Sequence, residues 1–352
     1  MTSPLITVLI DTYNYGHFIE GAIDSVLGQD FPPEQMQILV VDDGSADDTA
    51  ARVRKYGDRL QFFCKPNGGQ ASTLNFGIER ARGEIVALLD GDDYWLPGKL
   101  RRVMDEFARH PQAGMVYHDF FFKRDNSSAP LPASGLAGLS GFLPDNPKNL
   151  VGYDIPLCAA LAFRRTVLQR LLPIPPSLVV QADAHLSACV IFVAPIVYVS
   201  EPLTVHRVHS GNLWNWAGNS PPACIIFEGD SAAKARLERR VLATRAIGVG
   251  VREWLVKNGF DVNRPELRAF LAQWVIQSRV AEFALSPPGR LRFFRHLLEQ
   301  AQYSGARISR RHLLVQYGNA FASLLVGYHN FPRLDEWRLA VKRFLRSMVR
   351  RA

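Results

Sequence analysis

The stretch Ile85-Val86-Ala87-Leu88-Leu89-Asp90-Gly91-Asp92-Asp93 decides the fold class of this chain. Its apolar part is too short for a helix, so it predicts a buried strand that ends in carboxylates. The run from Met36 to Val41, followed by Asp42-Asp43-Gly44-Ser45, has the same design. Apolar strands of this kind are typical of parallel sheets covered on both faces, and their carboxyl ends line the crevice where open α/β sheets bind ligands.

Outward from these two strands, short apolar runs alternate with helical patterns. In chain order the predicted elements are strand Leu5–Ile10, helix His17–Leu27, strand Met36–Val41, helix Ala46–Tyr56, strand Leu60–Phe63, helix Ala71–Ala81, strand Ile85–Leu89, helix Pro97–Arg109 and strand Met115–His118. Pro97 favours a helix start because its fixed backbone angle suits the first helical residue. The alternation predicts an α/β protein with a doubly wound, mainly parallel sheet flanked by helices.

The second half of the chain has less regular patterns. Residues 126–149 are rich in Pro, Gly, Ser and Asn and predict an irregular loop, either over the active face or as a link between halves. A helix is expected at Asp183–Val190, a strand at Ile196–Val199, and only helices beyond Pro221. We therefore expect a catalytic domain over residues 1–219 and a helical region over residues 220–352.

Composition excludes several classes of protein. The chain has 352 residues, of which 47% are hydrophobic, and this is enough for a sizeable core. No apolar stretch reaches the roughly 18 residues of a spanning helix, and no basic segment precedes the first strand, so neither membrane insertion nor secretion is expected. The scattered cysteines fit reduced, buried thiols in the cytosol; they are Cys64, Cys158, Cys189 and Cys224.

Residues 333–352 form a basic tail that supplies +5 of the net charge of +8. Its apolar residues recur at helical spacing: Trp337, Val341, Phe344, Leu345 and Met348. Such a basic amphipathic last helix can rest on an anionic membrane surface, or it can dock on the protein with its basic face in solvent. Nucleic-acid binding is not expected, because no aromatic-interleaved basic motif accompanies the tail.

The two acidic clusters point to the chemistry. Ser45 is expected to cap the next helix, whereas Asp43 at the crevice can accept a hydrogen bond from a nucleobase or a ribose. Asp90, Asp92 and Asp93 crowd three negative charges into four residues, which favours a metal site over a plain acidic turn. An Asp-x-Asp suits Mg²⁺ or Mn²⁺, which in turn neutralises a phosphate. The sequence therefore predicts an enzyme for a diphosphate-bearing substrate.

Five motifs in order make the first 100 residues resemble a known family. They are Thr12-Tyr13-Asn14, Val40-Val41-Asp42-Asp43-Gly44-Ser45 with Asp48-Thr49, Asn67-Gly68-Gly69-Gln70, Asn75-Phe76-Gly77-Ile78, and Leu89-Asp90-Gly91-Asp92-Asp93 with Pro97 and Lys99-Leu100. This pattern is similar to that of the family 2 glycosyltransferases of the GT-A fold, and the resemblance covers residues 4–210. It implies an inverting transfer of a sugar from a nucleotide-activated donor, with Mn²⁺ or Mg²⁺ as cofactor.

The resemblance also implies roles for residues on the donor side. Those that it places around the nucleotide sugar are Thr12, Tyr13, Asn14, Asp43, Asn67, Asn75, Asp90 and Gly91. It implies Asp92 as a metal ligand, with Asp93 as an alternative ligand. Asn67 and Asn75 have a second interpretation as turn and capping residues. The chain departs from the family at Asp11, where a proline is common.

The catalytic base is matched further along the chain. Direct displacement at the anomeric carbon needs a carboxylate near the acceptor hydroxyl. The resemblance places this base at Asp183, although Ala182 stands where the family usually has Glu. Helix capping is the alternative role for Asp183, and His185 is a second choice for the base.

The resemblance ends with the stretch from His206 to Asn212, which is similar to the Tyr-Arg-x-His-x-x-Asn of many such domains. It implies His209 at the metal and Arg207 at the departing diphosphate. Trp214 and Trp216 could form a platform for an acceptor sugar, or they could pack in a core.

Three functions remain open. The first is a cytoplasmic inverting glycosyltransferase with a UDP-sugar donor and a glycan or lipid-linked glycan acceptor, in peripheral contact with the inner face of the membrane through its basic tail. The second is a sugar-nucleotide nucleotidyltransferase, which would need a Gly-rich, basic phosphate loop that residues 11–16 lack. The third is a non-catalytic binding module, which loss of the Asp-x-Asp or of the base would indicate, and neither is lost.

Overall fold

The computed structural model describes residues 4–124, 129–132, 138–146, 149–150, 153, 155–209, 212, 231–286, 288–304 and 320. The chain divides into two compact units: Met1–Trp216 with Ala246–Leu267, and Ala217–Arg245 with Arg268–Ala352. The domain limits of 1–219 and 220–352 stay a prediction. The basic tail and the tryptophans at 214 and 216 lie outside the described residues.

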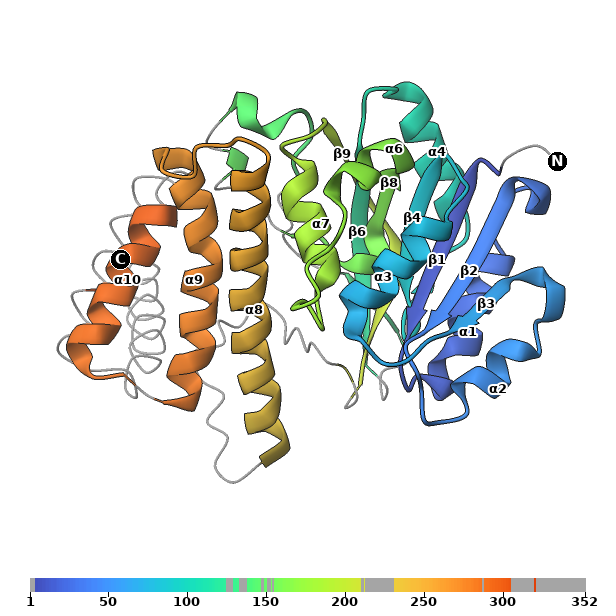
Figure 1. The fold of residues 1–352 in the computed structure, drawn as a ribbon, viewed down its shortest axis with the longest axis horizontal. Helices are drawn as coiled ribbons and strands as arrows, with labels where there is room; N and C mark the ends of the chain where they lie inside the picture. Colours follow the sequence, from blue (N-terminus) through green and yellow to red (C-terminus); the bar gives the residue numbers. More distant parts are fainter. Residues whose placement is uncertain are drawn as a thin grey trace, which may run out of the picture. The chain divides into compact units, whose positions relative to one another are not determined.

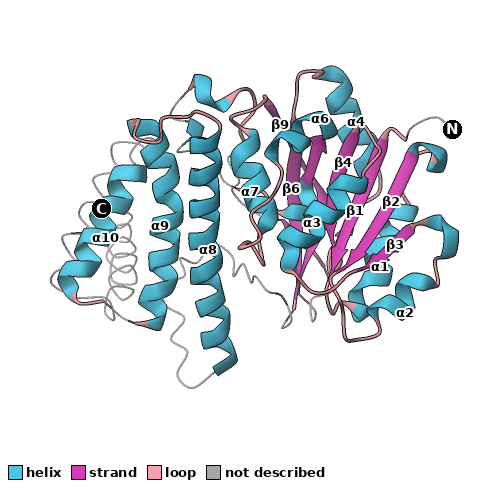
Figure 2. Cartoon of the chain, viewed as in Figure 1, coloured by secondary structure: helices cyan, strands magenta, loops and turns pink. Residues whose placement is uncertain are grey.

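The first unit is built around a mixed sheet, drawn in magenta in Figure 2. Its described strands are β1 (Ile6–Thr12), β2 (Met36–Asp42), β3 (Gln61–Cys64), β4 (Ile85–Asp90), β5 (Tyr94–Trp95), β6 (Met115–Arg124), β7 (Leu131–Pro132), β8 (Leu161–Arg164) and β9 (Ile196–Val208). They lie in the order β3-β2-β1-β4-β8-β6-β9-β5, and β7 pairs with β6. β3, β2, β1 and β4 are parallel, as are β6 and β9, whereas β8 runs antiparallel to both of its neighbours. The expected mainly parallel sheet flanked by helices is confirmed.

Helices cover both faces of this sheet (Figure 1). They are α1 (Gly16–Leu27), α2 (Thr49–Arg54), α3 (Gly69–Arg80), α4 (Lys99–Arg109), α6 (Arg165–Leu168) and α7 (Ala182–Val190), with 3-10 turns at Pro33–Gln35, Gly57–Arg59, Leu143–Asp145, Cys158–Ala160 and Gln169–Leu171. α3 and α7 contact each other and lie over one face, while α1 and α4 pack on the other.

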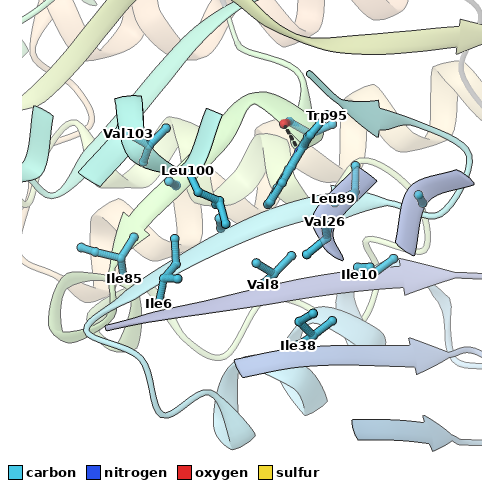
Figure 3. Packing of buried hydrophobic residues seen from close by; sticks show 14 of the residues in the cluster. Ile6, Val8, Ile10, Val26, Ile38, Ile85, Leu89, Trp95, Leu100 and Val103 are labelled. Carbon is cyan, nitrogen blue, oxygen red and sulfur yellow. Dashed lines mark hydrogen bonds between the residues drawn. The ribbon is translucent and has the colours of Figure 1, made fainter. Parts of the chain in front are cut away.

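The face under α1 and α4 carries a large apolar core (Figure 3). Ile6, Val8 and Ile10 of β1 point into it and pack with residues such as Val26 of α1 and Leu100 of α4. Every residue of β1 is buried, which fits the mainly apolar run from Ile6 to Ile10.

The opposite face of β1 approaches α3 closely. A β-carbon on Gly77 of α3 would lie only 2.3 Å from a methyl group of Leu9, so the helix can pack this near to the strand only with glycine there. Side chains alternate along a strand, and Asp11 therefore shares the Leu9 face, under α3 and α7. This placement decides which groups meet at the crevice.

Several elements differ from the sequence prediction. β5 and β8 were not predicted, and β6 and β9 extend well beyond Met115–His118 and Ile196–Val199. Glu201-Pro202 suggests an end to the strand, but a shift in pairing register after His118 accommodates it as a bulge. α2 starts only at Thr49, because the Asp47 carboxylate accepts hydrogen bonds from the backbone N–H and hydroxyl of Thr49 and orders the preceding turn. Cys64 is exposed at the end of β3, so the expectation that it is buried was wrong.

The second unit is helical in its described part, as expected beyond Pro221. It includes most of α9 (Pro265–Leu285) and α10 (Arg290–Ser304), together with the first half of α8 (Ser231–Lys257). Ion pairs of Glu282 with Arg245 and Arg292 link these helices. No helix of the described residues is long and apolar enough to cross a membrane.

Candidate active site

The acidic clusters sit where parallel strands end. Asp11 on β1 and Asp90 on β4 are paired in register, and Asp42 closes β2 on the other side of β1. Three carboxylates therefore arrive at one edge of the sheet because their strands are parallel neighbours. The three carboxylates have different hydrogen-bond partners, and these partners indicate which carboxylate holds a loop in place and which is available for chemistry.

Asp42 organises the loop after β2. It is fully buried, and its carboxylate accepts hydrogen bonds from the backbone N–H and the hydroxyl of Ser45. Asn14 ties this loop to the end of β1: its N–H donates to the Ser45 hydroxyl over 2.7 Å, and its side-chain oxygen accepts from Ala46 over 2.8 Å. Asn14 has a φ of 56°, a left-handed conformation that asparagine tolerates. Its predicted contact with the nucleotide sugar remains a prediction.

Asp43 faces the turn that precedes α3. Its two carboxylate oxygens accept the N–H groups of Gly68 at 3.0 Å and Gly69 at 2.7 Å, and the Lys65 ammonium pairs with it. Tyr13 directly follows the last residue of β1 and is 40% exposed, so its ring is available to a ligand. Asp43 thus fixes the turn before α3, next to the place where the sequence predicts a nucleotide.

The two predicted asparagines are in different settings. Asn67 is exposed on the turn before α3. Asn75 instead exchanges two hydrogen bonds of 2.9 Å with the backbone of Ile174, and so fastens α3 to the segment before α7. The structure therefore gives Asn75 the anchoring contacts of its second interpretation, while Asn67 lies in the open.

Asp92 meets the histidine that the sequence predicts as its partner. His209 Nε2 lies 3.2 Å from Asp92 Oδ2, and Asn212 Nδ2 donates to the same oxygen over 3.0 Å. All three side chains are at least nine-tenths buried. Phe18 stacks on the imidazole with ring centres 4.2 Å apart, and Tyr15 meets it edge-on. Burial, followed by the charge of Asp92, raises the pKa of the Tyr15 hydroxyl.

Asp93 points elsewhere. It is fully buried and bonds to His206 Nδ1 at 3.0 Å and to the backbone N–H of Arg207 at 3.0 Å. Burial raises the pKa of Asp93, although His206 opposes the rise; burial alone would lower the pKa of His206, but Asp93 holds it above its usual value. The two adjacent aspartates thus have different partners: Asp92 contacts His209, whereas Asp93 binds two residues of β9.

Arg207 clamps the acidic loop to α1. Its guanidinium donates to the backbone carbonyls of Asp92, Asp93 and Phe18. It also lies over the Phe18 ring, 4.9 Å from the ring centre. The Arg207 cation is thus bonded to the backbone of the Asp-x-Asp loop. Its contact with the diphosphate stays a prediction.

Asp11, Asp90 and Cys158 form the second group of possible ligands. Two carboxylate oxygens and the thiol sulfur lie within 4.8 Å of one another. Burial raises the pKa of Asp11 to about 7 even though a hydrogen bond from Gln70 opposes the rise. Burial, and then the charge of Asp11, raise the pKa of Asp90 well above its usual range. Carboxylates placed this closely need a proton or a cation between them.

Asp183 at the start of α7 adds a further carboxylate to this group. It is the second residue of α7, 8% exposed, and its charge acts on both Asp11 and Asp90. Burial raises the pKa of Asp183 to about 6. His185 points away from this site, because its ring lies against Cys189 and the backbone of Gly250. Asp183 is therefore the better placed of the two candidates for a base.

The residues present fit a hard divalent cation. Asp92 offers a carboxylate oxygen, the ligand type that Mg²⁺ and Mn²⁺ prefer, and the His209 imidazole lies 3.2 Å from it as a further donor. Asp11 Oδ1 is buried without a hydrogen-bond partner among the described residues. A buried carboxylate oxygen in that state favours a bound cation nearby.

Sequence reasoning missed several members of the site. Asp11 was noted only as a departure from a family pattern, and Asn212 only as part of a motif. Gln70 likewise belongs to one of the five motifs without a predicted role, and Cys158 has no pattern around it that points to the site, since their contacts join segments far apart in the chain.

The substitution Asp11→Asn should stabilise the metal-free protein at alkaline pH. The pKa of Asp11 is raised from 3.8 to about 7, so this carboxylate favours folding below pH 4 and that contribution is lost as the pH rises through 7. Relative to the natural protein, the free energy of unfolding of the variant should be higher at pH 8, by at most about 4 kcal/mol, and nearly equal at pH 4. Urea unfolding with chelator at both pH values measures this, and an equal gain at both would contradict it.

Comparisons with known proteins find glycosyltransferases among the similar sequences. The model of the family described as "Glycosyl transferase family 2" matches residues 7–171. An uncharacterized glycosyltransferase of Nostoc sp. is 31% identical over 219 residues, 59% of this chain and 66% of that protein. An uncharacterized glycosyltransferase of Mycoplasma pneumoniae is 30% identical over 234 residues, 64% of this chain and 76% of that protein. The chain spans only 30% of a third relative, from Rickettsia typhi, at 41% identity over 98 residues.

Two solved structures resemble this one. The S. aureus protein TarS 1–349 in complex with UDP has a TM-score of 0.55 and 19% identity, over 95% of this chain and 91% of that one. The mannosyltransferase PcManGT from Pyrobaculum calidifontis, in complex with GDP-Man and Mn²⁺, has a TM-score of 0.52 and 18% identity, over 98% of this chain and 88% of that one. At such identities the likeness concerns the fold.

Proposed function

The chain belongs to glycosyl transferase family 2, and from this premise we propose that it is an inverting enzyme that moves a sugar from a nucleoside diphosphate sugar to an acceptor hydroxyl. Its fold is the GT-A fold that the sequence predicts. The observation that carries the proposal is that Gln70 bonds to Asp11 and Asp90 at the strand ends and to Ala182 on α7, so that Asp183, the next residue, brings a third carboxylate close to the first two. An inverting transfer needs both a donor side and a base.

On the donor side, Tyr13, Thr12 and Asp43 would hold the base and the ribose, and Asp90 the sugar nucleotide beyond them. Asp92 and His209 would hold Mn²⁺ or Mg²⁺, whose charge neutralises the diphosphate when the metal is bound. This proposal is supported by the 3.2 Å contact of the two side chains.

On the acceptor side, Asp183 would remove the proton from the attacking hydroxyl. A base with a pKa of about 6 is ionised at neutral pH and still basic enough to accept that proton. Attack opposite the leaving diphosphate inverts the anomeric centre, so an α-linked donor gives a β-linked product.

The donor and acceptor are proposed by class. TarS has been crystallised with UDP and with UDP-GlcNAc, and PcManGT with GDP-Man and Mn²⁺. We propose a UDP-sugar as donor and a glycan or lipid-linked glycan as acceptor, with peripheral membrane contact through the tail at 333–352. A nucleotidyltransferase is disfavoured because residues 11–16 lack a basic, Gly-rich loop, and a non-catalytic module because Asp92 and Asp183 are both present.

The first experiment is thermal unfolding with a panel of nucleoside diphosphates and nucleotide sugars, each with Mn²⁺ and with chelator. A ligand that binds only the folded state at 100 times its Kd stabilises it by about 2.7 kcal/mol, so a bound donor should raise Tm by several degrees. We expect uridine nucleotides to do so, and only with the metal. No shift with any nucleotide would overturn the proposed function, and a metal-dependent shift confined to another base would replace the donor class.

A further inference from the structure

Gln70, the second residue of α3, binds three segments with one side chain. Its amide nitrogen donates to Asp11 Oδ2 over 3.3 Å and to Asp90 Oδ1 over 3.2 Å. Its amide oxygen accepts the backbone N–H of Ala182 over 2.9 Å. β1, β4 and α7 are thus joined through a single amide group.

The chemistry of the neighbours determines the orientation of this amide. The Ala182 N–H can only donate, so the amide oxygen must face it, and the NH₂ group then faces the carboxyl oxygens of Asp11 and Asp90, which can accept. With the amide turned over, its oxygen would face two carboxylates and its NH₂ group would face the N–H. Both hydrogens of the Gln70 nitrogen and its oxygen are therefore used in the only arrangement that satisfies all three partners.

The contact with Ala182 concerns the start of α7. The first N–H groups of a helix have no partner inside the helix, and the residue before α7, Gln181, makes no side-chain cap. Gln70 supplies the missing acceptor from another helix. The backbone N–H of Gln70 also donates to the carbonyl of Val179, and that of Ala71 donates to the carbonyl of Leu178. These two bonds attach α3 to the segment that precedes α7. The next residue after Ala182 is Asp183.

We propose that Gln70 is a positioning residue, which fixes the N-terminus of α7, and with it the base Asp183, at a set separation from the donor-side carboxylates Asp11 and Asp90. This inference rests on the proposed function. A displacement of the base by about 1 Å is enough to lower a rate by about 100-fold, so the attachment matters for turnover more than for donor affinity.

The chain contains a matched control. Gln29 is buried and makes the same set of bonds away from the crevice: its amide nitrogen donates to the carbonyls of Ser25 and Leu96 over 3.0 Å each, and its oxygen accepts the N–H of Leu100 over 3.1 Å. Gln29→Met and Gln70→Met therefore remove equivalent hydrogen bonds and keep a similar side-chain length. Only the second change removes a bond to Ala182, the residue before the base Asp183.

The test compares both variants with the natural protein. Release of nucleoside diphosphate is followed with UDP-N-acetylglucosamine, or with the nucleotide sugar that stabilises the protein most in the panel above. Gln70→Met should lower kcat by about 100-fold with a KM for the donor within about threefold, whereas Gln29→Met should keep both values even if its Tm falls. Hydrogen exchange of the peptide over residues 178–190 should quicken in Gln70→Met alone, because the Ala182 N–H loses its partner.

A charge-swapped pair keeps the proposal testable if Gln70→Met folds poorly. Gln70→Glu keeps an acceptor for Ala182 but presents a carboxylate to Asp11 and Asp90, and adding Asp11→Asn restores a donor toward one of the two and removes one of the three negative charges. The double variant should recover at least about tenfold in kcat over Gln70→Glu. A normal kcat in Gln70→Met, a loss confined to KM, or no recovery in the double variant would each overturn the inference. A natural protein inactive with every donor would instead count against the proposed function.

Discussion

Asp183→Asn should lower kcat for sugar transfer by about 100- to 10,000-fold, the usual contribution of a positioned general base. The amide has nearly the same shape but cannot accept the proton of the acceptor hydroxyl. Affinity for the nucleoside diphosphate should stay within about twofold, because Asp183 belongs to α7 and not to the loops after β1 and β2 that we propose hold the nucleotide. Initial rates of nucleoside diphosphate release, together with calorimetric titration of UDP in Mn²⁺, separate the two effects.

The pH profile of the natural enzyme provides an independent check on this role. Since burial raises the pKa of Asp183 to about 6, kcat should fall about tenfold for each pH unit below that value, as the base becomes protonated. Asp105→Asn, on the exposed side of α4, is the matched control and should change neither the rate nor the profile. Normal turnover in Asp183→Asn would move the base to another residue.

Asp92→Asn should abolish the metal-dependent part of donor binding. The substitution removes the charge that faces His209 but leaves a side chain of the same size, so the affinity for UDP in Mn²⁺ should fall at least about 100-fold. With chelator, the variant and the natural protein should bind UDP equally weakly. Calorimetric titration with and without Mn²⁺ measures all four affinities.

The neighbouring residue supplies the comparison. Asp93 lies in a buried pair with His206, so Asp93→Asn should lower the Tm while the metal-dependent affinity changes only a few-fold. If Asp92→Asn bound UDP as tightly as the natural protein and with the same dependence on Mn²⁺, the assignment of Asp92 to the metal would be wrong. If Asp93→Asn alone lost the metal dependence, Asp93 would be the ligand.

Short-range patterns determined much of this protein. The apolar runs that end in Asp42 and Asp90 are β2 and β4, and the helix predicted at Ala71–Ala81 is α3 within two residues at each end. Such elements are predictable because a strand's burial and a helix's periodicity are written in adjacent residues. The resemblance of ordered motifs predicted the family, which the comparisons confirm, whereas the assignment of Asp183 as the base stays a prediction.

Contacts between distant residues were decided only by the tertiary structure. The resemblance put His209 at the metal but left Asp92 and Asp93 as alternative ligands, and only the structure shows that Asp92 meets His209, 117 residues away, while Asp93 meets His206, 113 residues away. Gln70 reaches Ala182 across 112 residues. Sequence spacing carries no information about such distances, because they depend on which strands pair and which helices cover them. The sequence therefore predicted which residue types gather at this site. Which partner each carboxylate meets depends on the packing of β1, β4, β9 and α7.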